Sequence, residues 1–280
     1  MRIFPGLTVL GAVVVAGCNL STDLPTSQRV GIINVSQFGD GDTATLRADG
    51  VFFQTGPNIQ LQLPNTSAVD DSCDVSDYNG PIENPLPHYD NLNAGPSISV
   101  VTDKVETSMV PAPNSVGSII YSIPGGPVAF TPGSDLNFDI PGDTGGYPAQ
   151  TAKVRTLLPA TLGAVERHPT DNLHLSWSPA GSQSGAVQLE FLFSSDSSAT
   201  PDKVMFCRLR DDGSYDIPKS IASQWAASPD DAQSLTGLRW ITTIVQNNDV
   251  LLDVIIQVPI TPATFIDEPV PQDIRVSEAR

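Results

Sequence analysis

Residues 236–258, TGLRWITTIVQNNDVLLDVIIQV, decide the fold class, because they hold two strand patterns joined by a turn. Every second residue from Val250 to Val258 is valine, leucine or isoleucine, so these side chains share one face of an extended strand. The triplet Asn247-Asn248-Asp249, which separates this run from the apolar residues before it, is typical of a tight hairpin turn. The stretch therefore predicts a long antiparallel hairpin with one face buried in a core.

The same two-residue period recurs along much of the rest of the chain. It is clear in Leu136–Ile140, Leu173–Trp177 and Val187–Phe193, where apolar residues alternate mainly with polar ones. Between such runs lie 25 prolines and 22 glycines, which are spread along the chain as turn residues. Only residues 219–227 suggest a helix, and a short one. We therefore expect an all-β fold made of antiparallel β-sandwich domains.

Leu158-Pro159 and the residues that follow it suggest a boundary between two such domains. We expect a first β-sandwich domain over residues 29–158 and a second over residues 159–262, followed by a proline-rich acidic tail over residues 263–280. Within the first domain, residues 65–96 are rich in Asp, Asn and Pro, and we expect them to form a long irregular connection.

The charge balance bounds the partners of the chain. With 14 basic and 31 acidic residues its formal net charge is −17. Such a surface repels nucleic acid and anionic lipid headgroups. A basic partner, a divalent cation or no charged partner is expected instead, and simple solubility is the alternative explanation.

Two acidic clusters could attract a divalent cation, and calcium prefers several such oxygens from a flexible loop. One is Asp40-Gly41-Asp42, which lacks a third ligand at the expected place. The members of the other are Asp70, Asp71, Asp74, Asp77 and Asn79, with Gly80 behind them. The spacing of neither matches the calcium loop of an EF-hand, so a solvated turn is the simpler interpretation of both.

The N-terminus carries an export signal. After a basic start, Ile3–Gly17 is an apolar run without charge, and Cys18 follows it. This is the layout of a secretory signal peptide, and Val15-Ala16-Gly17-Cys18 resembles the lipobox of bacterial lipoproteins. The resemblance implies that residues 1–17 are removed and that Cys18 is acylated, with residues 18–28 as a tether. Ordinary cleavage and a retained membrane anchor are the alternatives.

Cys73 and Cys207 are the two other cysteines. Export brings a protein to a compartment where disulfides persist, so we predict a bridge between them. Two buried free thiols are the alternative.

Residues 159–193 resemble the opening of an immunoglobulin or fibronectin type III sandwich. They have a proline near the start, Trp177 on an early strand, and Leu189 and Phe191 on the next. The following segment, FCRLRDDGSYDIP at 206–218, departs from that family.

That segment is more similar to a group of uncharacterised exported lipoproteins from myxobacteria and Gemmatimonas-like bacteria. Asn93-Ala94-Gly95-Pro96 and Gly145-Gly146-Tyr147-Pro148-Ala149 are similar to the same group. The resemblance implies an architecture and no particular activity.

Residues that carry chemistry are sparse. The three histidines, His88, His168 and His174, are scattered. The chain contains no nucleophile elbow, no His-Glu-x-x-His, no Cys-x-x-Cys and no phosphate-binding loop. We therefore predict no catalytic site, no cofactor and no metal centre. A carboxylate pair of a glycoside hydrolase is the alternative, because acidic residues are abundant.

These patterns together predict a non-catalytic, lipid-anchored protein of the bacterial cell envelope, on the periplasmic or outer face of a membrane. It would act through protein–protein contacts at the membrane surface, as an accessory subunit that stabilises a periplasmic-facing membrane complex. Residues 65–96 and the turn Asp211–Pro218 are the expected contacts, since loops on a rigid scaffold carry binding residues. The alternative is a carbohydrate-binding or hydrolytic secreted module. Trp177 and Trp240 are predicted to face the core, which leaves Trp225 as a candidate sugar platform.

Overall fold

The computed structural model describes residues 28–56, 69–78, 90–113, 118–166, 169–179, 185–194, 201–225, 232–261 and 265–266. Most of these residues lie in strands, and most of the strand pairs are antiparallel. The predicted short helix is α1 (Lys219–Trp225), and a single 3₁₀ turn, η1 (Gly41–Thr43), joins the first two strands. The prediction of an all-β, sandwich-like fold is therefore confirmed.

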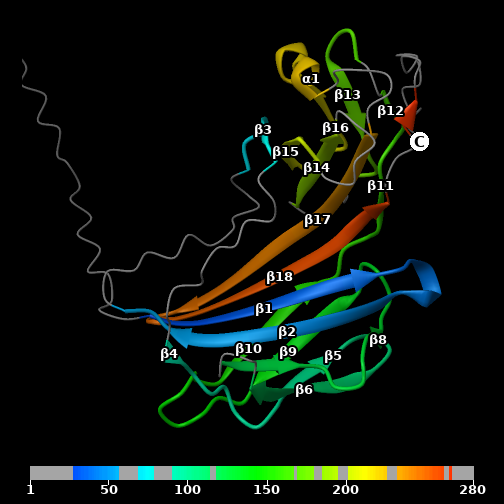
Figure 1. The fold of residues 1–280 in the computed structure, drawn as a ribbon. Coiled ribbons are helices and arrows are strands. Elements are labelled where there is room, and N and C mark those ends of the chain that lie inside the picture. The colour runs from blue at the N-terminus through cyan, green and yellow to red at the C-terminus, as the bar shows by residue number, and fades with distance from the viewer. Residues whose placement is uncertain are drawn as a thin grey trace, which may run out of the picture.

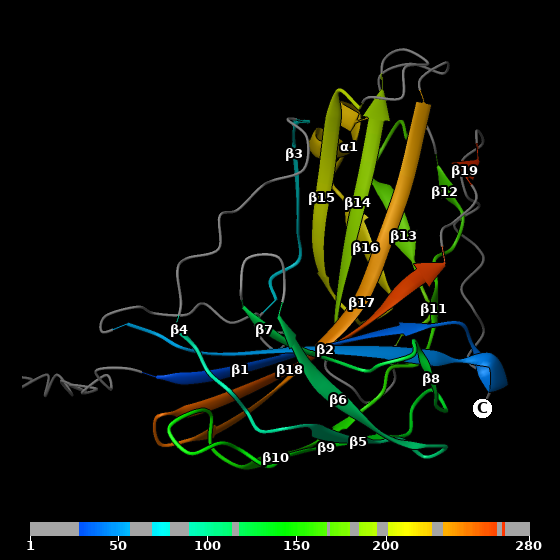
Figure 2. The same ribbon diagram turned by 60° about the horizontal axis from the view of Figure 1, so that its bottom comes forward.

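The lower half in Figure 1 is a sandwich whose two layers belong to one hydrogen-bonded path, in the order β10-β9-β5-β6-β7-β2-β1-β18. The path bends so that the β5, β9 and β10 end lies under β1, β2 and β18, as Figure 2 also shows. Two short strands pair with β2 besides. The strands are β1 (Arg29–Phe38), β2 (Thr45–Gln54), β4 (Asp90–Asn91), β5 (Ile98–Val101), β6 (Glu106–Pro113), β7 (Ile119–Ser122), β8 (Val128–Ala129), β9 (Asp135–Ile140), β10 (Gln150–Arg155) and β18 (Val250–Thr261).

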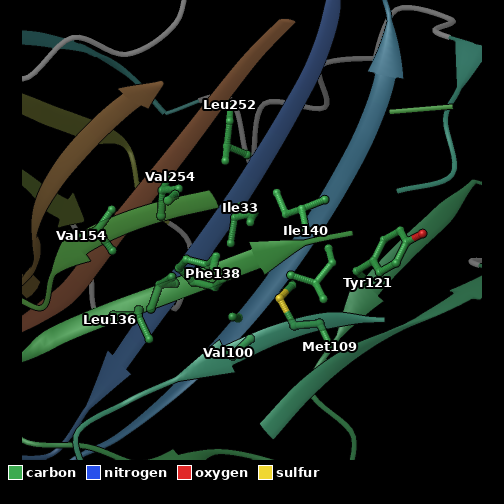
Figure 3. Close-up of a cluster of buried hydrophobic side chains, with 14 of the residues drawn as sticks. Ile33, Val100, Met109, Tyr121, Leu136, Phe138, Ile140, Val154, Leu252 and Val254 are labelled. Carbon is green, nitrogen blue, oxygen red and sulfur yellow. The ribbon is translucent and has the colours of Figure 1, made fainter. Parts of the chain in front are cut away.

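Alternating side chains from both layers fill the space between them. Figure 3 shows Ile33 of β1 and Leu252 and Val254 of β18 directed toward Phe138 and Val154 of the opposite layer. All five are buried. Burial of each such side chain stabilises the fold by roughly 1.5–3 kcal/mol, so this core holds the two layers together.

The upper half is a second sandwich around its own core. One layer has the order β17-β14-β15-β3. The other contains the β13–β16 pair, α1 and short strands of which one, β11, pairs with β18. The strands are β3 (Ser72–Asp77), β11 (Ala160–Thr161), β12 (Val165–Glu166), β13 (Leu173–Ser176), β14 (Ala186–Ser194), β15 (Lys203–Arg210), β16 (Ser214–Ile217), β17 (Ala232–Asn247) and β19 (Phe265–Ile266).

The predicted hairpin is the β17–β18 pair, and it runs through both halves (Figure 1). Leu235 of β17 packs in the upper core, whereas the alternating residues Val250 to Val258 of β18 pack in the lower core. The turn places Asn248 at φ 53°, a conformation that asparagine tolerates better than most residues. The sheet is thus continuous across the boundary predicted at residues 158 and 159.

Pairings between distant segments depart from the expectation of purely antiparallel sheets. β1 pairs with β18 in parallel, from Arg29 opposite Val250 to Ser36 opposite Gln257. Residues 65–96 were expected to be irregular, which is wrong for two parts of them: β3 forms the outer strand of the upper sheet and β4 pairs with β2. In the tail expected over residues 263–280, β19 pairs with β12.

Candidate functional site

Several of the residues singled out in the sequence lie outside the described part of the chain. They are Cys18, Asn79, Gly80, His88 and His168. The side chain of Trp225 lies outside it too. Within the described ranges, no helix combines the length and the apolar character that crossing a bilayer requires.

Both predicted acidic clusters contain residues that hold backbone in place. Asp71 accepts hydrogen bonds from the backbone N–H and the Nε of Arg210, at 2.7 and 2.8 Å. Partial burial raises the pKa of Asp71, but the hydrogen bonds and charge of Arg210 outweigh it and leave that pKa below its usual value. In the other cluster the carbonyl oxygen of Asp40 accepts a hydrogen bond from the Thr43 hydroxyl at 3.0 Å. Among the described residues, no three His, Cys, Asp or Glu side chains are grouped as a metal site would need.

The motif at 206–218 contains one half of a buried ion pair. Arg239 is fully buried, and its Nε lies 2.7 Å from Oδ2 of Asp211. Oδ1 of Asp211 accepts a further hydrogen bond from the indole N–H of Trp177 at 2.9 Å. The Arg239 guanidinium also donates to the carbonyl oxygens of Leu158, at 3.0 Å, and of Ser178. Asp211, expected to be part of a contact loop, therefore joins the ends of β13 and β15 to Arg239 of β17, which in turn holds the segment that links the two halves.

The two other motifs, at 93–96 and 145–149, lie against each other. The backbone N–H of Tyr147 donates to the carbonyl oxygen of Asn93 at 2.8 Å. Gly146 has to lack a side chain, because a Cβ there would collide with that same carbonyl oxygen. The Tyr121 hydroxyl accepts from the backbone N–H of Ala94 at 2.8 Å and donates to the carbonyl oxygen of Gly95 at 2.7 Å. These motifs are explained by close packing of two loops, whose Ala94 and Tyr147 are part of the lower core.

Cys73 and Cys207 are joined by a disulfide in the structure. They are directly opposite each other in the antiparallel pair β3–β15, with their Cα atoms 4.0 Å apart. Both are buried in the upper core. The bond therefore ties the outer strand β3 to the sheet.

The remaining aromatic and histidine predictions concern exposure. Trp177 and Trp240 are only 5% and 8% exposed, so the prediction that they face the interior is confirmed. His174 is exposed on β13, and its Nδ1 lies 2.7 Å from Oδ1 of Asp216 on β16. His174 and Asp216 are directly opposite each other in the β13–β16 pair, and Ser176 is opposite Ser214 two residues further along the same sheet.

Asp253 of β18 is a buried acid that sequence reasoning missed. It is fully buried, yet among the described residues neither carboxylate oxygen has a hydrogen-bond partner. The residues directly opposite it are Ile32 on β1 and Ile244 on β17. Burial among apolar groups disfavours the charged form and raises the pKa of Asp253 to about 6. The sequence did contain a signal for it, because Asp253 is a single charged residue within a largely apolar strand.

Replacement of Asp253 by asparagine is expected to change how stability depends on pH. In the wild type, the Asp253 carboxyl keeps its proton up to about pH 6 in the folded chain and loses it near pH 4 when unfolded. The contribution of Asp253 to stability is therefore fullest below pH ~4 and is lost as the pH rises through ~6. The loss between pH ~4 and ~8 amounts to about 2 kcal/mol. Urea unfolding of Asp253→Asn across this range will lack that loss, whereas Asp139→Asn, at an exposed position of β9, will retain it. Equal pH dependence of wild type and Asp253→Asn would contradict the burial argument.

A hollow lies where β17 and β18 separate. Their pairing ends with Leu238 opposite Pro259, because proline has no backbone N–H with which to continue the ladder. Beyond this point Ile260 and Thr261 of β18 pair with β11, while residues 232–237 of β17 pair, among the described residues, with β14 alone. Figures 1 and 2 show the two strands diverging here. We call this region the β17–β18 fork.

The β17–β18 fork encloses about 360 Å³. Its lining residues are Gln188, Glu190, Leu235, Thr236, Gly237, Leu238, Pro259 and Ile260. The apolar members include buried Leu235 and Ile260, and the polar ones are the side chains of Gln188, Glu190 and Thr236. A largely apolar hollow with a few polar groups is the usual form of a binding site. Sequence reasoning missed it because it depends on where two strands part.

The chain matches no family model and no curated protein sequence.

Proposed function

We propose that this protein is a non-catalytic, lipid-anchored protein of the bacterial cell envelope that acts by contacting other proteins at the membrane surface, as an accessory subunit that stabilises a membrane complex. The observation that carries the proposal is how the polar residues of the described motifs are used. Asp71, Asp211 and Tyr121 each fasten strands or loops of the scaffold. The β17–β18 fork, by contrast, presents polar side chains beside a strand edge that no described strand pairs with.

The lipid anchor is supported by the sequence alone, through the lipobox at residues 15–18. Several acyl chains on one cysteine hold a protein at a bilayer stably, whereas one chain gives only marginal binding. A sandwich on such a tether would keep its sheet faces and strand edges close to the membrane, where they meet the extramembrane parts of other proteins.

Mass spectrometry of the protein extracted intact from its own membranes tests the anchor. The expected mass is that of a chain beginning at an acylated Cys18. Cys18→Ser is expected to stop acylation and release the protein from the membrane fraction, and Thr151→Ser, at an exposed position of β10, serves as a control that leaves the lipobox unchanged. An unmodified chain that begins at Met1 would contradict the proposal and favour a retained anchor.

Gentle solubilisation of the same membranes tests the partner. We expect the protein to purify in constant stoichiometry with another envelope protein, and deletion of its gene to lower the heat stability of that complex. If every complex keeps its composition and heat stability while a hydrolytic activity disappears, the enzyme alternative is correct. A protein isolated alone with bound sugar would favour the carbohydrate-binding module.

A further inference from the structure

We infer that the β17–β18 fork binds an extended, positively charged segment of a partner protein, which adds as a strand to the free edge of β17. The inference rests on the proposed function and gives the partner a chemistry. It combines three observations: an unpaired strand edge, a carboxylate without a partner, and an apolar floor.

The free strand edge is the backbone of β17 where this strand borders the fork. Four consecutive residues, 235–238, border it. Side chains of consecutive strand residues point to opposite faces, so what these four share toward the hollow is their backbone. In the described structure residues 232–237 pair with β14 on one side only. Unpaired N–H and C=O groups of this kind are a template for an added strand.

The positive charge expected of the partner is inferred from the carboxylate of Glu190 on β14. Glu190 is half-buried beside the fork, and among the described residues its side chain has neither a hydrogen bond nor an ion pair. The residues directly opposite it are Phe206 and Thr236. Arg208, the cation that follows Phe206 by two residues, belongs to β15, on the far side of β14 from the fork. A lysine or arginine of the partner is thus the group that Glu190 lacks, and it suits a chain of net charge −17.

The apolar residues of the fork predict which side chains of the partner lie next to its basic residue. Leu238 and Pro259 lie at the vertex of the fork, and Ile260 lies against Gly237, where a Cβ would come within 3.3 Å of Ile260 Cβ. An added strand presents alternate side chains to each face, so aliphatic residues on the floor would alternate with residues near Glu190. The lining residues include no aromatic ring on which a sugar could stack, which favours a peptide over a carbohydrate.

The test uses the full-length protein in detergent and a fluorescein-labelled eight-residue peptide of alternating valine and lysine, with binding followed by fluorescence anisotropy. Two matched peptides accompany it: one has glutamate in place of lysine, and one is N-methylated along one edge. We expect the lysine peptide to bind. We expect each of the other two to bind at least about tenfold more weakly, because one reverses the charge and the other removes backbone donors.

Two variants localise the binding. Thr236→Arg fills the fork and is expected to weaken binding at least about tenfold, and Glu190→Gln about three- to tenfold, because it removes a charge-assisted contact. Their controls are Thr151→Arg on β10 and Glu106→Gln on β6, which make the same changes at exposed positions of the lower sandwich. Circular dichroism melting checks that all four variants are folded.

Failure to bind the lysine peptide, or equal binding by Thr236→Arg and wild type, would overturn the inference. So would oligosaccharides that displace the peptide. The proposed function is tested separately, because an envelope partner that still co-purifies with Thr236→Arg would leave that function standing and exclude the fork as its site. Peptide binding at the fork without any co-purifying partner would leave the inference standing and contradict the function.

Discussion

Replacing Arg239 with methionine is expected to destabilise the protein by about 3–5 kcal/mol, because it leaves the carboxylate of Asp211 buried without its counter-charge. The methionine fills much of the volume but supplies no donors. Trp177 still donates to Asp211, yet the carbonyl oxygens of Leu158 and Ser178 lose the guanidinium that they accept from. A loss of this size is a large share of the 5–15 kcal/mol that stabilises a typical domain.

Urea unfolding measures this change, with Arg208→Met as the control. Arg208 is exposed on β15, so its replacement is expected to alter stability by less than about 0.5 kcal/mol. The double variant Arg239→Met with Asp211→Asn separates charge from geometry. It should be less destabilised than the sum of the two single variants, because it no longer buries an unpaired charge. Strictly additive losses would show that the two residues do not interact.

The position of Arg239 also relates the Arg239–Asp211 ion pair to the β17–β18 fork. Arg239 precedes Trp240 on β17 and lies two residues from Gly237, which lines the β17–β18 fork. By holding the carbonyl oxygen of Leu158 it also fixes the segment that leads to β11, the strand with which β18 pairs after the fork. Arg239 therefore connects β17, whose residues line the fork, with the segment that leads to β11.

Removal of the disulfide, by Cys73→Ala with Cys207→Ala, is expected to cost about 3–5 kcal/mol. The bond closes a loop across a sequence separation of 134 residues, and in the chain-entropy model a loop of this length restricts the unfolded state by about 5 kcal/mol. Part of the loss of stability would come from the folded state. In the described structure β3 is the outermost strand of the upper sheet and pairs only with β15, so without the disulfide it is held by that one strand.

Urea unfolding with and without a thiol reductant distinguishes these contributions. The wild type should lose stability when it is unfolded in reductant, whereas the double variant should not respond to reductant at all. Amide hydrogen exchange will show whether β3 detaches first, as its single partner strand predicts. Unfolding of the wild type that does not depend on reductant would mean that the bond is absent in solution.

The sequence by itself determined where many strands lie and which side of them is buried. A two-residue period of apolar residues shows which face is buried in Val250 to Val258 and in Val187 to Phe193. The same period correctly predicted that Trp177 and Trp240 lie in the interior. It failed for β6, where Pro111 and Pro113 and a mostly exposed pattern hide a strand. This segment is a strand because it pairs with β5 on one side and β7 on the other, although its own residues do not favour a strand.

Only the tertiary structure decided which strands are partners. The parallel contact of β1 with β18 and the antiparallel contact of β3 with β15 join residues that are far apart in the chain. The period of a strand shows which face it buries but not which strand lies beside it, because neighbouring strands interact through backbone groups that every residue carries. The Arg239–Asp211 pair, the buried Asp253 and the β17–β18 fork all follow from those pairings. Their chemistry depends on which side chains the partner strands bring together, and no local pattern contains that.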